Sequence, residues 1–311
     1  MHITPIFWQG RIDGVTEEHL RWHQIIELGN LQDTDTDYGI VGFECDEGVL
    51  RNKGRVGAKK GPDFLRKACA NFPKINDISI ADFGNVVCEK NDIEICQNEL
   101  AKIIEILQAK AIKTIVFGGG HEVLFGHYSG LRAAFPHEKI GIINFDAHFD
   151  NRSIDPAVGA TSGTGFWQIA QLDSNYNYLA IGIQQNSNTK ALFDETVRTK
   201  TEFILGDDFF SENQEYVSSR IDTFIENIDV LYVTFCLDVF AAAFAPGVSA
   251  TAYNGLFPDF FFKKIFKKII SSSKLKAFDI AELNPDFDID NRTAKLAASL
   301  VFELLNCNAT A

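Results

Sequence analysis

The chain has 311 residues, of which 46% are hydrophobic and 23% are charged, as in an ordinary soluble globular protein with a sizeable core. Its net charge of −13 argues against a nucleic-acid backbone or an anionic membrane as the partner. No apolar run approaches a membrane span of roughly 20 residues, the start lacks a signal-peptide pattern, and the six cysteines show no paired metal spacing. We therefore predict a cytoplasmic protein with reduced thiols.

After a polar, acidic stretch over 1–37, strand-like and helix-like segments alternate. Short apolar or β-branched runs predict strands at 38–43, 78–84, 112–117, 140–145, 177–183, 201–205, 229–235 and 275–280. Helical spacing of apolar residues, or proline in a first turn, predicts helices at 63–69, 91–110, 124–134, 189–198, 213–225, 257–270 and 291–305. The alternation continues without a break in composition, so we expect a single doubly wound α/β domain over 1–311 with a mostly parallel sheet.

A long, glycine-rich and charged loop at 44–57 separates the first strand from the first helix, which is more typical of a functional loop than of a plain connection. Four later strands end in side chains of the kind that bind metal ions. These are His121; Asp146, His148 and Asp150; Cys236 and Asp238; and Glu282. Because ligands bind at the carboxyl ends of parallel strands, we expect these groups to share one crevice.

The central triplet is the clearest of these signals. If the backbone stays extended after the strand at 140–145, Asp146, His148 and Asp150 share one face, roughly 6–7 Å apart along it. Two carboxylates and an imidazole form a ligand set for a divalent cation. The alternative interpretation is a solvated polar strand end.

These motifs make the chain resemble the arginase/agmatinase (ureohydrolase) family, and within it the formimidoylglutamase branch. The family motifs stand here as Gly119-Gly120-His121, Asp146-Ala147-His148-Phe149-Asp150, Cys236-Leu237-Asp238 with Pro246-Gly247, and Glu282 before Asn284-Pro285. The loop at 42–58 and the segment at 245–250 favour that branch. The resemblance covers nearly the whole chain.

The resemblance implies a three-layer α/β/α sandwich that holds two Mn²⁺ ions. By position, His121, Asp146 and Asp150 would bind one ion, and Asp146, His148 and Asp238 would bind the other. Water shared by two cations loses a proton near neutral pH and becomes a nucleophile. The implied reaction is hydrolysis of N-formimidoyl-L-glutamate, in histidine degradation, to L-glutamate and formamide, with Asp150 relaying the proton. A homo-oligomer is usual for the family.

Further residues are expected to contact the small-molecule substrate. Glu282 matches the family residue that hydrogen-bonds the cationic amidine nitrogens, although it could instead cap its strand end. Arg152 is the expected anchor for the substrate carboxylates, because a guanidinium pairs with a carboxylate at two points. Asn151 could add a hydrogen bond. Ser162 stands where arginases carry a proton-shuttling histidine, which argues against arginase itself.

Cys236 departs from the family pattern, which has a bridging aspartate there. A thiolate is a softer ligand than Mn²⁺ prefers, so Cys236 either ligates directly or stands beside a weakened second site. Two alternatives stay open: a guanidino hydrolase such as agmatinase or guanidinobutyrase, and a non-catalytic relative. Arg51 and Arg55 are weaker anchor candidates that equally suit loop-tethering salt bridges, and His127 is expected to be structural.

Overall fold

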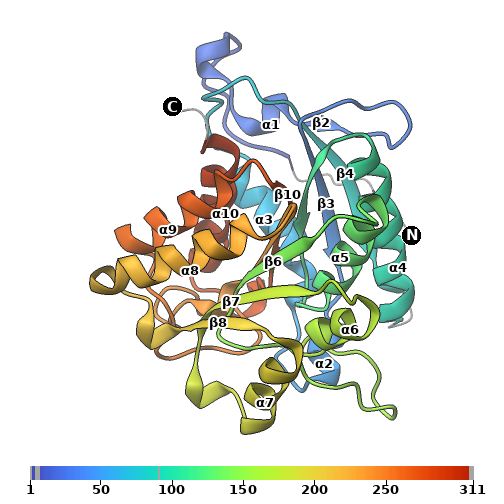
Figure 1. Cartoon of the computed structure of the whole chain (residues 1–311). Coiled ribbons are helices and arrows are strands. Elements are labelled where there is room, and N and C mark those ends of the chain that lie inside the picture. The colour runs from blue at the N-terminus through green and yellow to red at the C-terminus, as the bar shows by residue number, and fades with distance from the viewer. Residues whose placement is uncertain (1, 4–7, 90–91, 308–311) are drawn as a thin grey trace.

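The computed structural model describes residues 2–3, 8–89 and 92–307 (Figure 1). Its strands form one ten-stranded sheet in the order β1-β4-β3-β5-β10-β9-β6-β7-β8, with β2 paired to β4. Only the β1–β4 pair is antiparallel among the described strands. The strands are β1 (His2–Ile3), β2 (Glu27–Leu28), β3 (Tyr38–Glu44), β4 (Ile80–Val87), β5 (Lys113–Phe117), β6 (Ile140–Phe145), β7 (Asn177–Ile183), β8 (Glu202–Leu205), β9 (Val230–Cys236) and β10 (Leu275–Ala281).

Helices cover both faces of this sheet, which gives the three layers that the resemblance implied. On one face pack α3, α8, α9 and α10, and on the other pack α4, α5, α6 and α7 (Figure 1). The helices are α1 (Trp22–Ile25), α2 (Glu47–Arg51), α3 (Gly61–Cys69), α4 (Ile93–Ala109), α5 (Val123–Ala134), α6 (Gly165–Leu172), α7 (Lys190–Thr199), α8 (Gln214–Glu226), α9 (Phe260–Ile270) and α10 (Arg292–Asn306).

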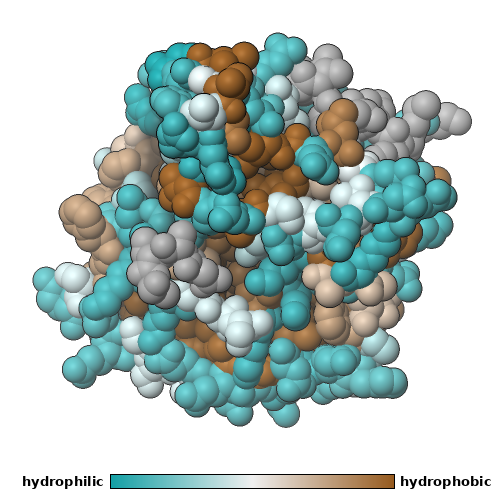
Figure 2. All heavy atoms as spheres, turned by 90° about the horizontal axis from the view of Figure 1, so that it is seen from above, coloured by the Kyte–Doolittle hydropathy of each residue, from teal (hydrophilic) through white to brown (hydrophobic). Residues whose placement is uncertain are grey.

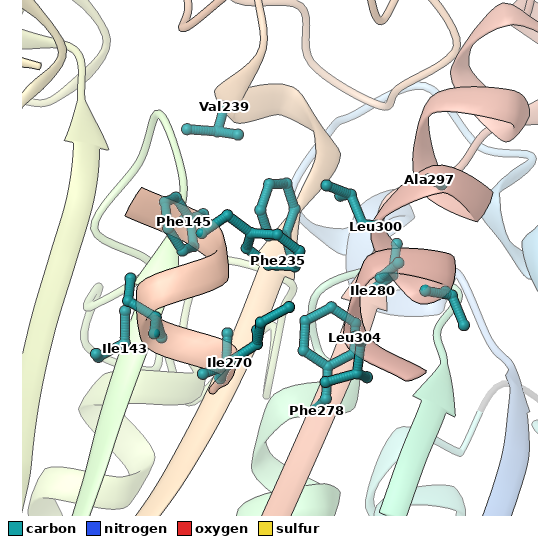
Figure 3. Packing of buried hydrophobic residues seen from close by; sticks show 14 of the residues in the cluster. Ile143, Phe145, Phe235, Val239, Ile270, Phe278, Ile280, Ala297, Leu300 and Leu304 are labelled. Carbon is teal, nitrogen blue, oxygen red and sulfur yellow. The ribbon is translucent and has the colours of Figure 1, made fainter. Parts of the chain in front are cut away.

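The core follows from the alternation of side chains along each strand. In β9, Val233 and Phe235 point into the cluster beneath α9 and α10, whereas Tyr232 points into the cluster beneath α5 and α6. Figure 3 shows the first cluster, in which Phe235 lies beside Phe145 of β6 with ring centroids 4.9 Å apart. Because both faces of β9 are covered, it reads in the sequence as a continuous apolar run.

The predicted strands and helices are confirmed, with ends that differ by one to three residues. Five short elements were not anticipated: β1, β2, α1, α2 and α6. The helix α2 lies inside the loop at 44–57, where glycines and charges hide any helical period. Missing it matters, because α2 forms part of the wall of the site described below.

None of the helices in the described ranges has the length and apolar character of a membrane span. Figure 2 shows the face that lies uppermost in Figure 1, where apolar residues gather in the middle and polar residues surround them.

Candidate metal centre

The four strands that end in predicted metal ligands are consecutive in the sheet, in the order β5-β10-β9-β6. Their carboxyl ends therefore meet at one edge. A cavity of about 320 Å³ opens there, a size that suits a small molecule. The predicted site residues that line it are His121, His148, Asp150, Arg152, Ser162, Cys236, Asp238 and Glu282, and Asp146 lies fully buried beside them.

The central triplet leaves β6 as a turn and does not continue the strand, so our expectation of an extended face was wrong. The Asp146 carboxylate accepts a hydrogen bond from the backbone N–H of His148 at 2.8 Å, which closes the turn. Asp150 follows with a left-handed backbone, φ 46°. The backbone is therefore turned where the three side chains stand.

His121 is held in one orientation by both of its ring nitrogens. Its Nε2 lies 2.9 Å from the Thr234 hydroxyl, and its Nδ1 lies 3.0 Å from Asp146 Oδ2 and 2.9 Å from Asp150 Oδ2. Thr234 donates its only proton to Asp279 at 2.6 Å, so the hydroxyl can only accept from His121. The neutral ring then carries its hydrogen on Nε2, and the lone pair of Nδ1 faces the two carboxylates.

A second group of donors lies beside the first and shares Asp146 with it. His148 Nδ1 lies 3.2 Å from Asp238 Oδ2 and 3.4 Å from Asp146 Oδ1. Asp238 is buried, and its Oδ1 has no hydrogen-bond partner among the described residues. Burial, and next the charge of Asp146, raise the pKa of Asp238 to about 6. The neighbouring His148 lowers this pKa, but it does not offset burial and the charge of Asp146.

Cys236 belongs to the first group by distance. One donor atom each from His121, Asp146 and Cys236 lie within 4.8 Å of one another, as do the donors of Asp146, His148 and Asp238. Burial and then the surrounding carboxylates raise the pKa of the Cys236 thiol well above its ordinary value. In the absence of a cation, Cys236 is therefore a neutral thiol.

These donors fit a pair of divalent cations. Two groups of three share one carboxylate, Nδ1 of His121 presents a lone pair, and Asp238 has an unsatisfied oxygen. In the cation-free protein, burial lowers the pKa of His121, but hydrogen bonds that its ring donates to Asp146 and Asp150 outweigh burial and hold that pKa well above the usual range. The imidazolium then supplies the charge that a metal would otherwise provide.

A buried polar network behind His121 was not predicted. Asp279 accepts from Thr234 and Tyr232 and lies 2.8 Å from Nδ1 of His127, whose Nε2 lies 2.9 Å from the Thr114 hydroxyl. His127 is thus a structural histidine, as expected. The only sequence signal for the network was polar residues inside otherwise apolar strands.

Glu282 occupies the end of β10 with a left-handed backbone, φ 71°. Its Oε1 accepts from the backbone N–H of His121 at 2.7 Å, while Oε2 has no partner in the part of the chain described. Burial raises the pKa of Glu282 to about 7. One oxygen of Glu282 therefore ties two strand ends together, and its contact with a substrate amidine stays a prediction.

Two positively charged side chains at the cavity have no partner among the described residues. Arg152 and Lys53 both line it, and neither side chain forms a hydrogen bond or ion pair with another described residue. Arg55 also lines the cavity, but its guanidinium donates to the carbonyls of Pro246 and Val248 and stacks on a ring. Arg55 thus tethers its loop. Lys53 was not predicted from the sequence as a site residue, although it lies in the long loop at 44–57.

The remaining predicted residues differ in their placement. Ser162 lines the cavity and accepts from Nδ2 of Asn52 at 3.2 Å. Asn151 does not line this cavity, because its Nδ2 donates to the Leu192 carbonyl at 3.0 Å. Arg51 forms ion pairs with Glu47 and with a residue of α4, outside the cavity.

Comparison with known proteins gives consistent matches along the chain. The profile of the Arginase family matches residues 36–307. The chain is 40% identical over 307 residues to formimidoylglutamase from Staphylococcus carnosus, covering 97% of this chain and 98% of that protein. Formimidoylglutamase from Macrococcus caseolyticus is 40% identical over 305 residues, covering 97% and 96%.

Solved structures share the fold at lower identity. Formimidoylglutamase from Bacillus subtilis superposes with a TM-score of 0.84 at 17% identity, covering 97% of both chains. Trypanosoma cruzi formiminoglutamase, solved with Mn²⁺, superposes with a TM-score of 0.82 at 22% identity, covering 94% of this chain and 99% of that one.

Proposed function

Because this chain belongs to the arginase family, we propose that it is a manganese-dependent hydrolase that cleaves N-formimidoyl-L-glutamate to L-glutamate and formamide. The proposal rests on two groups of metal-ligand side chains that share Asp146. They lie beside a cavity that is also lined by the positively charged side chains of Arg152 and Lys53. The 40% identity to formimidoylglutamases over nearly the full length of both chains supports the choice of substrate.

His121, Asp146, Asp150, His148 and Asp238 would hold two Mn²⁺ ions. When bound, paired divalent cations lower the pKa of a shared water and polarise the substrate carbon–nitrogen bond. Cys236 lies close enough to the first group to add a ligand. Because a thiolate is softer than a carboxylate, we expect Cys236 to weaken manganese binding relative to an aspartate in that place.

The protein groups around the ions would orient the substrate and move protons. Glu282 lines the cavity, and its Oε2, which has no hydrogen-bond partner among the described residues, can accept an N–H of the cationic formimidoyl group. Asp150 is positioned to take a proton and to deliver it to the departing amino group of glutamate. Its left-handed backbone directs the carboxylate toward His121, 2.9 Å away.

A dicarboxylate substrate requires positive charge in an acidic site. Arg152 and Lys53 would supply that charge, since both line the cavity and neither is paired with a carboxylate of the described residues. Ser162 lies on the same wall and offers a hydroxyl. Asn151 is not among the residues that line this cavity, and its Nδ2 donates to the Leu192 carbonyl. Free thiols at all six cysteines support a cytoplasmic location.

The proposal is tested with purified protein and added Mn²⁺. We expect release of glutamate and formamide from formimidoylglutamate, and about two Mn²⁺ per chain in the active protein. Urea released from agmatine or guanidinobutyrate, with no product from formimidoylglutamate, would instead establish a guanidino hydrolase. No turnover of any of these compounds with manganese bound would establish a non-catalytic relative.

The carboxylate anchors are tested separately by kinetics. Because a hydrogen bond to a charged group contributes about 1.5–3 kcal/mol, Arg152→Ala and Lys53→Ala are each expected to raise KM about tenfold or more. Lys263→Ala, on the exposed surface of α9, is the matched control and should leave KM unchanged. An unchanged KM in Arg152→Ala would remove that residue from the substrate site.

A further inference from the structure

Three thiols meet at a second place in the fold, outside the cavity. Cys45 follows β3, Cys88 follows β4, and Cys96 lies in the first turn of α4. Glu44 pairs with Val87 in the parallel β3–β4 ladder, so the next two residues, Cys45 and Cys88, lie side by side. The three sulfur atoms lie within 4.8 Å of one another. Cys45 and Cys96 are buried, and Cys88 is half-buried.

A buried carboxylate stands next to this thiol cluster. Glu122 is completely buried; its Oε1 accepts from the backbone N–H of Gly48 at 2.9 Å, and its Oε2 has no hydrogen-bond partner among the described residues. The Cys45 thiol lies against the same carboxyl group. A buried oxygen without a partner calls for a physical explanation, such as an ion.

We propose that Cys45, Cys88 and Cys96 form a three-thiol binding site for a thiophilic cation, Zn²⁺ or Cu⁺, with the Glu122 carboxyl group beside Cys45. Four ligands at about 2.3 Å around zinc place sulfurs about 3.8 Å apart. The thiols are therefore within about 1 Å of the required spacing before any cation binds. Thiolates select these soft or borderline cations over Mn²⁺. The cluster and the candidate metal centre would thus bind different cations.

The protonation state of the cluster suits exchange of protons for a cation. Hydrogen bonds from Cys45 and Cys96 lower the pKa of Cys88 to about 4, and the pKa values of the other two thiols are raised. Binding a divalent cation forms three metal–sulfur bonds and displaces to solvent the protons that the thiols still hold, with no transfer of electrons.

The position of the cluster indicates what such a cation would do. The Cys45 carbonyl accepts from the backbone N–H of Gly120 at 2.9 Å, beside His121, and Glu122 holds Gly48 at the start of α2. A bound cation would therefore tie two strand ends and α4 together, directly behind the wall of the cavity. Because it binds the folded chain, it would raise the thermal midpoint. This inference does not depend on the proposed reaction.

The site is tested by titrating the full-length, fully reduced, manganese-loaded protein with Cd²⁺ under nitrogen. We expect one Cd²⁺ per chain, with an ultraviolet sulfur-to-cadmium charge-transfer band and a higher melting temperature. Cys88→Ser and Cys96→Ala should each weaken cadmium binding by more than about tenfold. Cys69→Ala, a buried cysteine elsewhere in the core, is the matched control and should leave the titration unchanged.

Two further measurements locate the cation without relying on the folding of the cluster variants. In the wild type, one equivalent of Zn²⁺ should protect Cys88 from iodoacetamide, as measured by peptide mass spectrometry. Cys236→Ser should keep the cadmium band. Absence of the band, no protection of Cys88, or a band that disappears in Cys236→Ser but persists in Cys88→Ser and Cys96→Ala would each overturn the proposal.

Discussion

Two buried carboxylate groups in this molecule contrast in how their charge is balanced. Asp82 in β4 accepts from Nε and Nη2 of Arg66 at 2.7 and 3.0 Å, from the indole N–H of Trp8 and from the backbone of Gly84. Both of its oxygens are satisfied within the chain. At the carboxyl end of the sheet, in contrast, Asp238 keeps a buried oxygen with no partner in the described part of the chain.

The difference separates a structural role from a functional one. An arginine built into the core balances Asp82, so the region is complete without a ligand. The candidate metal centre brings together Asp146, Asp150, Asp238 and Glu282 with two histidines, and burial and the charge of Asp146 raise the pKa of Asp238 to about 6 although His148 lies 3.2 Å away. A buried excess of negative charge persists in a fold when a cation balances it in the working protein.

The largest expected effect comes from removing the carboxylate that both donor groups share. Asp146→Asn should abolish manganese retention and lower kcat/KM for formimidoylglutamate by about 10⁴-fold or more, the scale seen when one member of a catalytic unit is lost. Metal content per chain and glutamate release measure the two effects. A variant that kept both its manganese and its turnover would remove the distinction between the two regions.

The converse substitution tests the structural region. Asp82→Asn leaves the buried Arg66 with only a longer contact to Asp63, at 3.7 Å, and should lower the free energy of unfolding by about 3–5 kcal/mol, measured by urea denaturation. Manganese content and kcat of the folded fraction should stay unchanged. The double variant Arg66→Met with Asp82→Asn should recover at least half of the loss, because neither charge remains. Loss of manganese in Asp82→Asn would contradict the contrast.

The sequence predicted the donors more fully than it predicted their surroundings. Apolar runs located the strands, and His121, Asp146, His148 and Asp238 stood at their ends. That the four strands are neighbours depends on the crossovers between them, which no local pattern encodes. The turn after β6 depends on a hydrogen bond from His148 to Asp146.

Residues that act from outside the motifs were harder to identify. Lys53 reaches the cavity because α2 and the turn after it fold back over the strand ends. The glycines in that loop conceal the helical pattern of α2 in the sequence. Thr234 and Asp279 stand within strongly β-prone segments, where their side chains were indistinguishable from core positions. Their contact across the sheet requires the register of β9 and β10, in which they are paired.

In the metal-free protein, the free energy of unfolding should depend on pH in a way that reveals the excess negative charge of the candidate metal centre. The folded pKa of Asp238 is about 6, above its ordinary value of 3.8, so the folded state binds more protons than the unfolded state between these values. Stability should therefore fall as pH rises from about 4 to about 6, by an amount on the order of 3 kcal/mol from this group.

Asp238→Asn should flatten that fall, while Asp82→Asn should shift the whole curve downward without flattening it. Chemical denaturation at a series of pH values, in the presence of a chelator, measures both. Added Mn²⁺ should reverse the slope in the wild type, because protons and metal compete for the same ligands. A wild-type curve that rose with pH in the chelated protein would show that Asp238 is balanced within the chain.

The smallest expected effect concerns the hydrogen-bond network that joins Asp279, through Thr234, to His121 of the candidate metal centre. Thr234→Val removes the hydroxyl that accepts from Nε2 of His121, so the hydrogen is no longer fixed on that nitrogen. Manganese affinity should fall about 10–100-fold, as for other partners of metal-binding histidines. Tyr232→Phe, which loses a contact with Asp279 but keeps the Thr234 hydroxyl, is the matched control. Of these two residues, Thr234 is the one that hydrogen-bonds His121. Equal losses of manganese affinity in both variants would therefore mean that the network acts through packing.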